Sequence, residues 1–228
     1  MLRAELKSPA RSAPAHMALD EAVLIASSAD ALVLRFYDWD GPACTFGYSQ
    51  PYAAALEQCR ARGWDDISPV RRATGGGIVF HDGDLTFSLV FPWDRLCAPD
   101  SIYENIHRGI HAAMKSMGAL TSLWSPPVRP AGTSQACFIR AEPMDLVGSD
   151  GHKILGGALR KKAGKGLYQG SLRPEGLGLT LEALRAAVLQ GAAREFGGAP
   201  CTELEPSWLE AGRCLETRYR GADWNERR

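Results

Sequence analysis

Residues 71–82 read RRATGGGIVFHD, so two arginines lead into three consecutive glycines and then into an apolar run. Three adjacent glycines are costly to order, because glycine has the most backbone freedom to lose. They are expected where the backbone turns through positive φ or passes very close to another group. The guanidinium groups of Arg71 and Arg72 could bind a carboxylate or phosphate there, or could be solvated at the corner of a hairpin. The stretch matches neither a P-loop nor a dinucleotide-binding fingerprint.

Strand patterns lie on both sides of this stretch. Residues 32–37 and 44–50 are rich in β-forming side chains, and residues 85–91 alternate in the way typical of a strand with one buried face. We therefore expect strand, glycine turn, strand, turn, strand: a meander whose glycine corner faces a ligand. A hairpin is expected at Asp150-Gly151, where both turn positions tolerate positive φ, and a further strand over residues 166–172.

Helical periodicity and terminal signals predict helices between these strands. Ser101 and Glu104 would form a capping box, and Thr180 would cap a later helix. Residues 1–12 are expected to be a tail, and residues 121–136, rich in Pro, Ser and Gly, a loop. The helices are expected over residues 15–26, 52–62 closed by Gly63, 101–117 closed by Gly118, and 180–190, and from Pro206 onward.

The composition suits one soluble globular domain, or at most two small ones. The chain has 228 residues, of which 45% are apolar and 23% charged, with a formal net charge of zero. Bulk charge therefore does not favour nucleic acid or anionic membranes, and no apolar run approaches the roughly 20 residues of a membrane span. The start lacks the apolar core of a secretory signal. Six scattered cysteines without a C-x-x-C pair are typical of reduced thiols, so we expect a cytoplasmic protein.

The glycine-rich stretch resembles a known family signature. The lipoate ligase and octanoyltransferase family, which is related to the biotin protein ligases, carries Arg-Arg-x-(Ser/Thr)-Gly-Gly-(Gly/Arg)-x-Val-x-His-Asp, and residues 71–82 meet every fixed position. The resemblance covers roughly residues 15–225. It implies an α/β fold of the class II aminoacyl-tRNA synthetase and biotin ligase type, with a mixed, mostly antiparallel sheet flanked by helices. We expect residues 1–228 to form a single catalytic domain without an accessory C-terminal domain.

A second block resembles the family's other signature. Cys137-Phe138 is followed by Asp-Leu-Val, by Gly-x-Lys-x-x-Gly-Gly-Ala around Lys153, and by Gln-x-Gly-Ser-Leu. The chain departs from the usual wording at Gly157, where Ser is commoner, and at Leu159, where many members have Gln. These departures weaken the transfer of polar roles at those two positions only.

The resemblance implies a pair of catalytic residues. Cys137 would be the nucleophile, and Lys153 would lie in the acyl pocket, where an ammonium would favour the thiolate of a group whose ordinary pKa is about 8.5. Backbone N–H groups near the glycine pairs 76–77 or 156–157 could stabilise an oxyanion. An apolar tunnel for the octanoyl chain could be lined by Phe46, Tyr48, Ile78 and Leu155. The residues expected to bind the acyl group or substrate are Tyr48, Arg71, Arg72, Gly75, Gly76, Gly77, His81, Gly156, Gly157 and Ala158.

Three functions remain open from the sequence. In the first, the protein moves an octanoyl group from octanoyl-acyl carrier protein through Cys137 to a lysine of a lipoyl domain, in glycine cleavage H protein or a 2-oxoacid dehydrogenase E2 component. It would need no cofactor, and the wording Gly47-Tyr48-Ser49-Gln50 favours this transferase. The second is a lipoate-protein ligase that uses ATP and Mg to form lipoyl-adenylate, with Cys137 incidental. The third is a non-catalytic member that only binds lipoyl domains or an acyl ligand. We expect no metal site of the protein's own.

Overall fold

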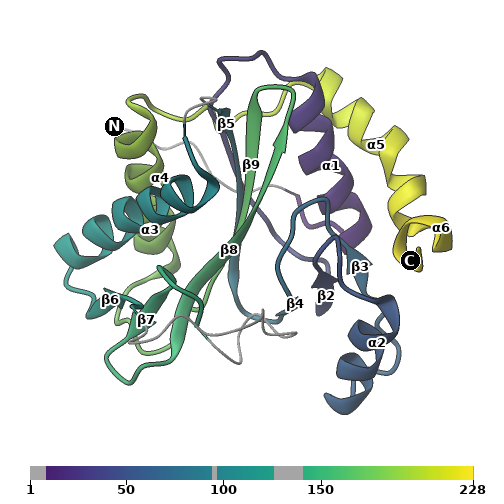
Figure 1. Cartoon of the computed structure of the whole chain (residues 1–228), viewed down its shortest axis with the longest axis horizontal. Coiled ribbons are helices and arrows are strands. Elements are labelled where there is room, and N and C mark those ends of the chain that lie inside the picture. Colours follow the sequence, from purple (N-terminus) through teal and green to yellow (C-terminus); the bar gives the residue numbers. More distant parts are fainter. Residues whose placement is uncertain (1–8, 94–96, 126–140, 228) are drawn as a thin grey trace.

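The computed structural model describes residues 9–93, 97–125 and 141–227, which fold around two sheets (Figure 1). The large sheet has the order β1-β5-β9-β8-β7-β6, with every neighbouring pair antiparallel. In the small sheet, β2 pairs parallel with β3 and antiparallel with β4. The large sheet consists of β1 (Val33–Phe36), β5 (Leu85–Pro92), β6 (Thr121–Leu123), β7 (Leu146–Gly148), β8 (Lys153–Lys162) and β9 (Lys165–Leu172). The small sheet consists of β2 (Ala43–Phe46), β3 (Val70–Arg71) and β4 (Ile78–His81).

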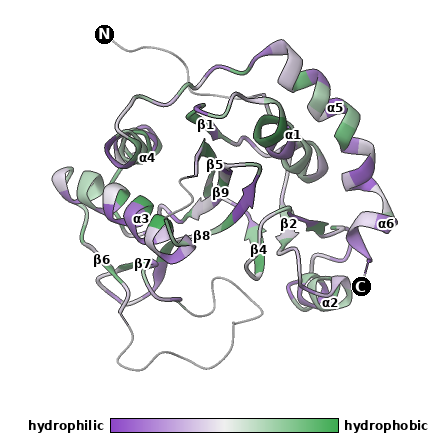
Figure 2. Cartoon of the chain, turned by 45° about the horizontal axis from the view of Figure 1, so that its top comes forward, coloured by the Kyte–Doolittle hydropathy of each residue, from purple (hydrophilic) through white to green (hydrophobic). Residues whose placement is uncertain are grey.

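Helices cover both faces of the large sheet, so the α/β prediction of a mostly antiparallel sheet flanked by helices is confirmed. In Figure 1, α3 and α4 lie together on one side, and α1 and α5 on the other. α1 is hydrophobic around most of its surface (Figure 2), because the sheet packs against one side of it and α5 against the other. The helices are α1 (Ala13–Ala26), α2 (Tyr52–Ala61), α3 (Pro99–Ser116), α4 (Leu181–Phe196), α5 (Pro206–Arg220) and α6 (Ala222–Asn225).

Strand β5 lies inside the large sheet and is buried on both faces, where one buried face was expected. Its apolar face, with Phe87 and Leu89, belongs to the main core that α3 and α4 cover. Its polar side chains are also inaccessible, since Thr86 and Ser88 are 4% and 3% exposed. They point to hydrogen-bond partners rather than to water: Ser88 donates to the carboxylate of Asp20 on α1 at 2.6 Å.

The predicted meander around the glycine turn was wrong. β3 and β4 both pair with β2, whereas β5 pairs with β1 and β9 in the other sheet. The glycine loop, residues 72–77, therefore crosses from one side of β2 to the other instead of turning a hairpin. It passes so close to the end of β2 that a Cβ on Gly47 would stand 1.9 Å from the carbonyl oxygen of Gly76. This close approach accounts for glycine on both sides of the contact.

Some of the predicted helix caps and segment boundaries were confirmed, and others were wrong. Thr180 caps α4, its side chain accepting from the N–H of Ala183, and Gly63 follows α2 with a φ of +75°. The capping box at Ser101 was wrong, because α3 starts earlier with Pro99 in the first turn, where its missing N–H costs nothing. The expected loop over residues 121–136 begins with a short strand, β6, and Arg11 of the expected tail bridges to Trp39.

Candidate active site

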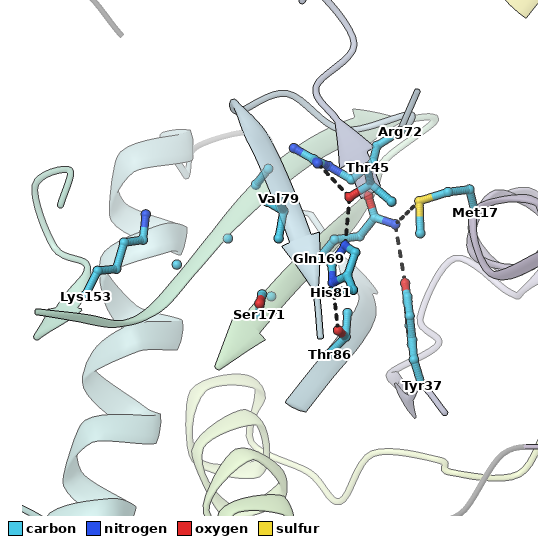
Figure 3. Close-up of a pocket in the computed structure, with 14 residues that line it drawn as sticks. Met17, Tyr37, Thr45, Arg72, Val79, His81, Thr86, Lys153, Gln169 and Ser171 are labelled. Atoms are coloured by element: carbon cyan, nitrogen blue, oxygen red, sulfur yellow. Dashed lines mark hydrogen bonds between the residues drawn. The ribbon is translucent and has the colours of Figure 1, made fainter. Parts of the chain in front are cut away.

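A narrow cavity lies between β8 and β9 of the large sheet and the strands β2 and β4 of the small one (Figure 3). It brings together several of the predicted site residues, namely Arg72, His81, Lys153, Gly156, Gly157 and Ala158. Its other lining residues are Met17, Tyr37, Thr45, Val79, Thr86, Gln169, Gly170 and Ser171. In Figure 3, Lys153 stands on one side of the cavity; on the other, Arg72, Thr45 and His81 form one connected group, and Gln169 forms another with Met17 and Tyr37. The site is thus built from segments far apart in the sequence.

Lys153 opens β8 and is held by a buried carboxylate. Its Nζ lies 2.7 Å from Oδ2 of Asp145, and the two side chains are 4% and 0% exposed. Asp145 also accepts from the hydroxyl of Tyr103 at 2.5 Å and from the N–H of Glu142 at 2.7 Å. Burial raises the pKa of Asp145, although Lys153 and these hydrogen bonds act in the opposite direction. The ammonium is therefore fixed at the cavity edge by a carboxylate whose ionisation is opposed by burial.

The glycine pair of β8 makes room for this arrangement. A Cβ on Gly156 would lie 2.2 Å from Cε and 2.4 Å from Nζ of Lys153, so the amine occupies the space of the missing side chain. A Cβ on Gly157 would lie 2.3 Å from the ring of Tyr168. The N–H of Gly157 donates to the hydroxyl of Tyr103 at 3.0 Å. The shape of the cavity near Lys153 thus depends on both glycines.

Arg72 lies on the opposite wall and organises the glycine loop. Its Nη1 donates to the hydroxyl of Thr45 at 2.9 Å, and its Nη2 donates at 2.9 Å to the carbonyls of Gly75 and Gly77. The side chain is buried, at 5% exposure. The glycine residues of the loop thus present their carbonyl oxygens to this guanidinium, which fixes the loop beside the cavity.

His81 is the centre of a second buried network. Its Nε2 lies 2.8 Å from the hydroxyl of Thr45, and its Nδ1 lies 2.9 Å from Oδ2 of Asp84. Asp84 also accepts from the hydroxyls of Thr86 at 2.7 Å and Ser171 at 2.5 Å. Burial alone would raise the pKa of Asp84, but the charge of His81 and these hydrogen bonds outweigh it and lower the pKa. In the described part of the chain, no group of three His, Cys, Asp or Glu residues could hold a metal ion.

Gln169 lines the cavity, although the sequence alone assigned no role to it. Its Nε2 donates to Asp20 at 2.6 Å, and its Oε1 accepts from the hydroxyl of Thr74 in the glycine loop at 2.6 Å. Asp20 is itself ion-paired with Arg35 at 2.8 Å. The amide therefore ties β9 to both α1 and the glycine loop. The signal was present as the first position of the Gln-x-Gly-Ser-Leu wording.

Five predicted binding residues are not among those that line this cavity, namely Tyr48, Arg71, Gly75, Gly76 and Gly77. The guanidinium of Arg71 is buried against the C-terminal segment, and Tyr48 is 39% exposed and packs edge-on against Trp224 at 6.0 Å between ring centroids. The side chain of Arg71 donates, over 2.6–3.1 Å, to the carbonyls of Tyr48, Gln50, Trp224, Asn225 and Arg227. Its donors are thus directed at protein carbonyls from two separate segments of the chain.

The lining expected for an acyl tunnel is not that of this cavity. Phe46 and Ile78 pack in an apolar cluster beneath α2, and Leu155 lies in the main core. Ile78 also borders a second, wider groove between α2, β4 and the β7–β8 hairpin, and Lys153 borders that groove as well as the cavity. The amine therefore stands where a narrow space and an open one meet.

Cys137 and Phe138 lie outside the described residues. The residues that flank this region are described: the N–H of Trp124 donates to the carbonyl of Asp145 at 2.7 Å, and the N–H of Met144 donates to that of Trp124 at 2.8 Å. The described residues on the two sides of this region are therefore bonded to each other beside the partner of Lys153.

The chain is similar to proteins of one known family. The family model of the lipoyl protein ligase A/B catalytic domain matches residues 12–201. The octanoyltransferase LipM of Symbiobacterium thermophilum is 37% identical over 175 residues, which cover 71% of this chain and 61% of that relative. The LipM of Kyrpidia tusciae is 30% identical over 266 residues, covering 95% of this chain and 96% of the relative. The chain thus spans about 61% of the length of the first relative.

A solved structure shares the fold. A T. acidophilum protein described as a lipoate protein ligase, with bound lipoic acid, superposes with a TM-score of 0.78 at 20% identity, covering 96% of this chain and 95% of that one. Among the described residues, the helices are all too short or too polar to cross a membrane. The match of the family model over most of the sequence, together with these relatives, shows that the chain belongs to the lipoyl protein ligase A/B catalytic domain family.

Proposed function

We propose that this protein is an octanoyltransferase that takes an octanoyl group from acyl carrier protein onto Cys137 and passes it to a lysine of a lipoyl-accepting domain. The relatives named as octanoyltransferases support this activity. The observation that carries the proposal is the buried ion pair of Lys153 and Asp145 at the cavity edge. An ammonium held in that position is suited to stabilise a thiolate and the negative charge of an acyl-transfer intermediate.

In the first step, the thiolate of Cys137 attacks the carbonyl carbon of the donor thioester. A new carbon–sulfur bond forms, the old one breaks, and the carrier leaves as a thiol after taking a proton. Lys153 stabilises the anionic sulfur before attack, and Asp145 holds the ammonium in place. Met17, Val79 and Ala158 supply apolar surface within the cavity for the acyl chain.

In the second step, the neutral amine of the acceptor lysine attacks the acyl-enzyme. An amide bond forms, the bond to sulfur breaks, and the Cys137 thiolate is restored while the amine proton goes to solvent. The groove on the far side of Lys153 offers an approach for this acceptor, because the amine borders both spaces. The proposed acceptors are the H protein of glycine cleavage and the lipoyl domain of a 2-oxoacid dehydrogenase E2 component.

Intact-protein mass spectrometry tests the proposal. Incubation with octanoyl-acyl carrier protein, without ATP, should give an octanoyl adduct that is absent in Cys137→Ala and is lost when lipoyl domain is added. The matched control is Cys214→Ala, which removes an exposed cysteine on α5 and should retain the adduct. An enzyme that forms no adduct, yet releases pyrophosphate from ATP only when lipoate is present, would instead be a lipoate-protein ligase.

A further inference from the structure

Two guanidinium groups lie against the ring of Tyr48 on the surface. The Cζ of Arg227 lies 4.0 Å from the ring centroid of Tyr48 and 4.0 Å from that of Trp224, so the guanidinium contacts both rings. The Cζ of Arg160 lies 4.9 Å from the centroid of Tyr48. We refer to Tyr48, Arg160, Trp224 and Arg227 as the Tyr48 cluster. Stacking on aromatic rings holds both cations in fixed positions.

The positive charge of this cluster is not balanced by a described carboxylate. Within the described residues, neither Arg160 nor Arg227 forms an ion pair, and the buried Nη2 of Arg227 has no hydrogen-bond partner. A third guanidinium, that of Arg71, lies behind them and donates to the carbonyls of Tyr48 and Arg227. Burial, followed by the charge of Arg227, lowers the pKa of Arg71, which is a sign of like-charge repulsion.

Two arginines of the neighbouring helix α5, in contrast, have carboxylate partners. Arg218 pairs with Glu21, and Arg220 with Glu216 at 2.5 Å. The charge of Arg227 and its hydrogen bond lower the pKa of the Tyr48 hydroxyl, and Arg160 contributes in the same direction. Guanidinium groups brought together without a carboxylate are suited to an external anion, which would remove their repulsion and satisfy their donors.

The cluster adjoins the glycine loop and the cavity. Arg160 follows Ala158, a cavity residue, by two positions on β8, so the two side chains share a face of the strand. The Nη1 of Arg160 donates to the carbonyl of Ala73 at 3.2 Å, and the N–H of Tyr48 donates to that of Thr74 at 2.9 Å. The cluster is therefore attached to the same loop that Arg72 fixes beside the cavity.

We propose that the Tyr48 cluster binds the phosphate of the acyl donor's carrier arm. An acyl carrier protein presents its acyl group as a thioester on a phosphopantetheine arm, so a phosphate accompanies the thioester at a fixed separation along the chain. Two guanidinium groups supply the paired N–H donors that a phosphate accepts. This inference rests on the proposed function for the identity of the ligand, but phosphate recognition can be measured without acyl transfer.

Calorimetric binding of phosphopantetheine and of pantetheine, which lacks the phosphate, tests the inference directly. The wild-type protein should bind phosphopantetheine at least about tenfold more tightly, as expected for charge-assisted hydrogen bonds. Arg160→Gln and Arg227→Gln should each reduce this preference, and the double variant should abolish it while binding pantetheine normally. Arg194→Gln removes an exposed arginine on α4, far from the cluster, and should keep the preference.

The outcomes separate this inference from the proposed function. Equal affinity of the wild-type protein for the two arms, or equal weakening of both by the arginine variants, would overturn phosphate recognition even if the octanoyl adduct forms. A phosphate preference that disappears in the double variant would support it even if no adduct is found. Inorganic phosphate should compete with phosphopantetheine in the wild-type protein and no longer do so in the double variant.

Discussion

Two buried carboxylates flank the cavity, each beside a nitrogen group, and their pKa values move in opposite directions. Asp84, next to His81, has a lowered pKa, while Asp145, next to Lys153, has a raised one. Both accept several hydrogen bonds, so the count of bonds does not explain the difference. At Asp145 the desolvation of the charge prevails, whereas at Asp84 the charge of His81 and the hydroxyls around it prevail.

The polar groups on the two sides of the cavity differ in character: one side is a hydrogen-bonded scaffold, and the other holds a buried ion pair. On the small-sheet side, Arg72, Thr45 and His81 form a connected chain of hydrogen bonds, and Arg72 fixes the glycine loop. On the β8 side, Lys153 and Asp145 hold separated charges where burial opposes them. Buried groups with a raised pKa, such as Asp145, are typical of functional sites. Variants on each side of the cavity test whether the two sides differ in this way.

Asp145→Ala should have the largest effect, because it leaves the buried ammonium of Lys153 without this carboxylate. Removing one member of a buried ion pair typically costs about 3–5 kcal/mol of unfolding free energy. Urea denaturation should show this loss, and adding Lys153→Met should recover part of it by removing the remaining charge. A double variant no more stable than Asp145→Ala would mean that the ion pair is not the source of the loss.

Gly156→Ala should separate activity from stability on the same side. The new Cβ would lie 2.2 Å from Cε and 2.4 Å from Nζ of Lys153, at the flexible end of that side chain, so the amine should shift while keeping its ion pair with Asp145. Misplacing a catalytic group by about 1 Å can lower a rate about 100-fold, and we expect acyl-enzyme formation to slow by about 10- to 100-fold. Gly41→Ala, in the turn before β2, where a Cβ also meets nothing within 4 Å, is the control. Unchanged kinetics with a folded Gly156→Ala would contradict the assigned position of the amine.

Gly157→Ala should have the converse result, a loss of stability. Its Cβ would lie 2.3 Å from the ring of Tyr168, which is fully buried and cannot turn away. Overpacking of this kind costs about 1–3 kcal/mol, measurable by thermal or chemical unfolding. Gly198→Ala, in open space after α4, should be neutral, and equal stability of the two variants would show that Tyr168 can move.

The smallest effect is expected from lowering the pH, which acts through Asp84 on the small-sheet side of the cavity. Because the pKa of Asp84 is lowered by folding, its ionised form contributes stability above the ordinary aspartate pKa of about 3.9, and this is lost as the pH falls below it. The difference in unfolding free energy between wild type and Asp84→Asn should therefore narrow from about pH 6 to about pH 3. A difference that stays constant over this range would exclude ionised Asp84 as its cause.

Local signals predicted elements well and pairing poorly. The cap at Thr180, the left-handed Gly63 and the Asp150-Gly151 hairpin are short-range features, and all are found. The division into two sheets was missed, because nothing within residues 70–81 tells β4 to pair with β2 rather than with β5. The polar side chains of β5 looked solvent-facing for a similar reason: their partners, such as Asp20, come from a distant helix.

The candidate site was predicted in part. Motif resemblance identified Arg72, His81 and Lys153, which the fold brings to one cavity. It did not indicate that Asp145 would hold the amine of Lys153. It also did not indicate that Arg71 would point away from the cavity, because carbonyls that bind Arg71 lie more than 150 residues further along the chain, for example that of Trp224 at a separation of 153. The roles of Cys137 and of the remaining binding residues stay predictions.

The distant partners of Arg71 also bear on the order of events during synthesis. Three of the five carbonyls that this guanidinium bonds, those of residues 224, 225 and 227, are synthesised long after residue 71. A nascent chain that ends before them would offer Arg71 only the carbonyls of Tyr48 and Gln50. The anchoring of the Tyr48–Gln50 segment to residues 224–227 through Arg71 should accordingly be a late step of folding.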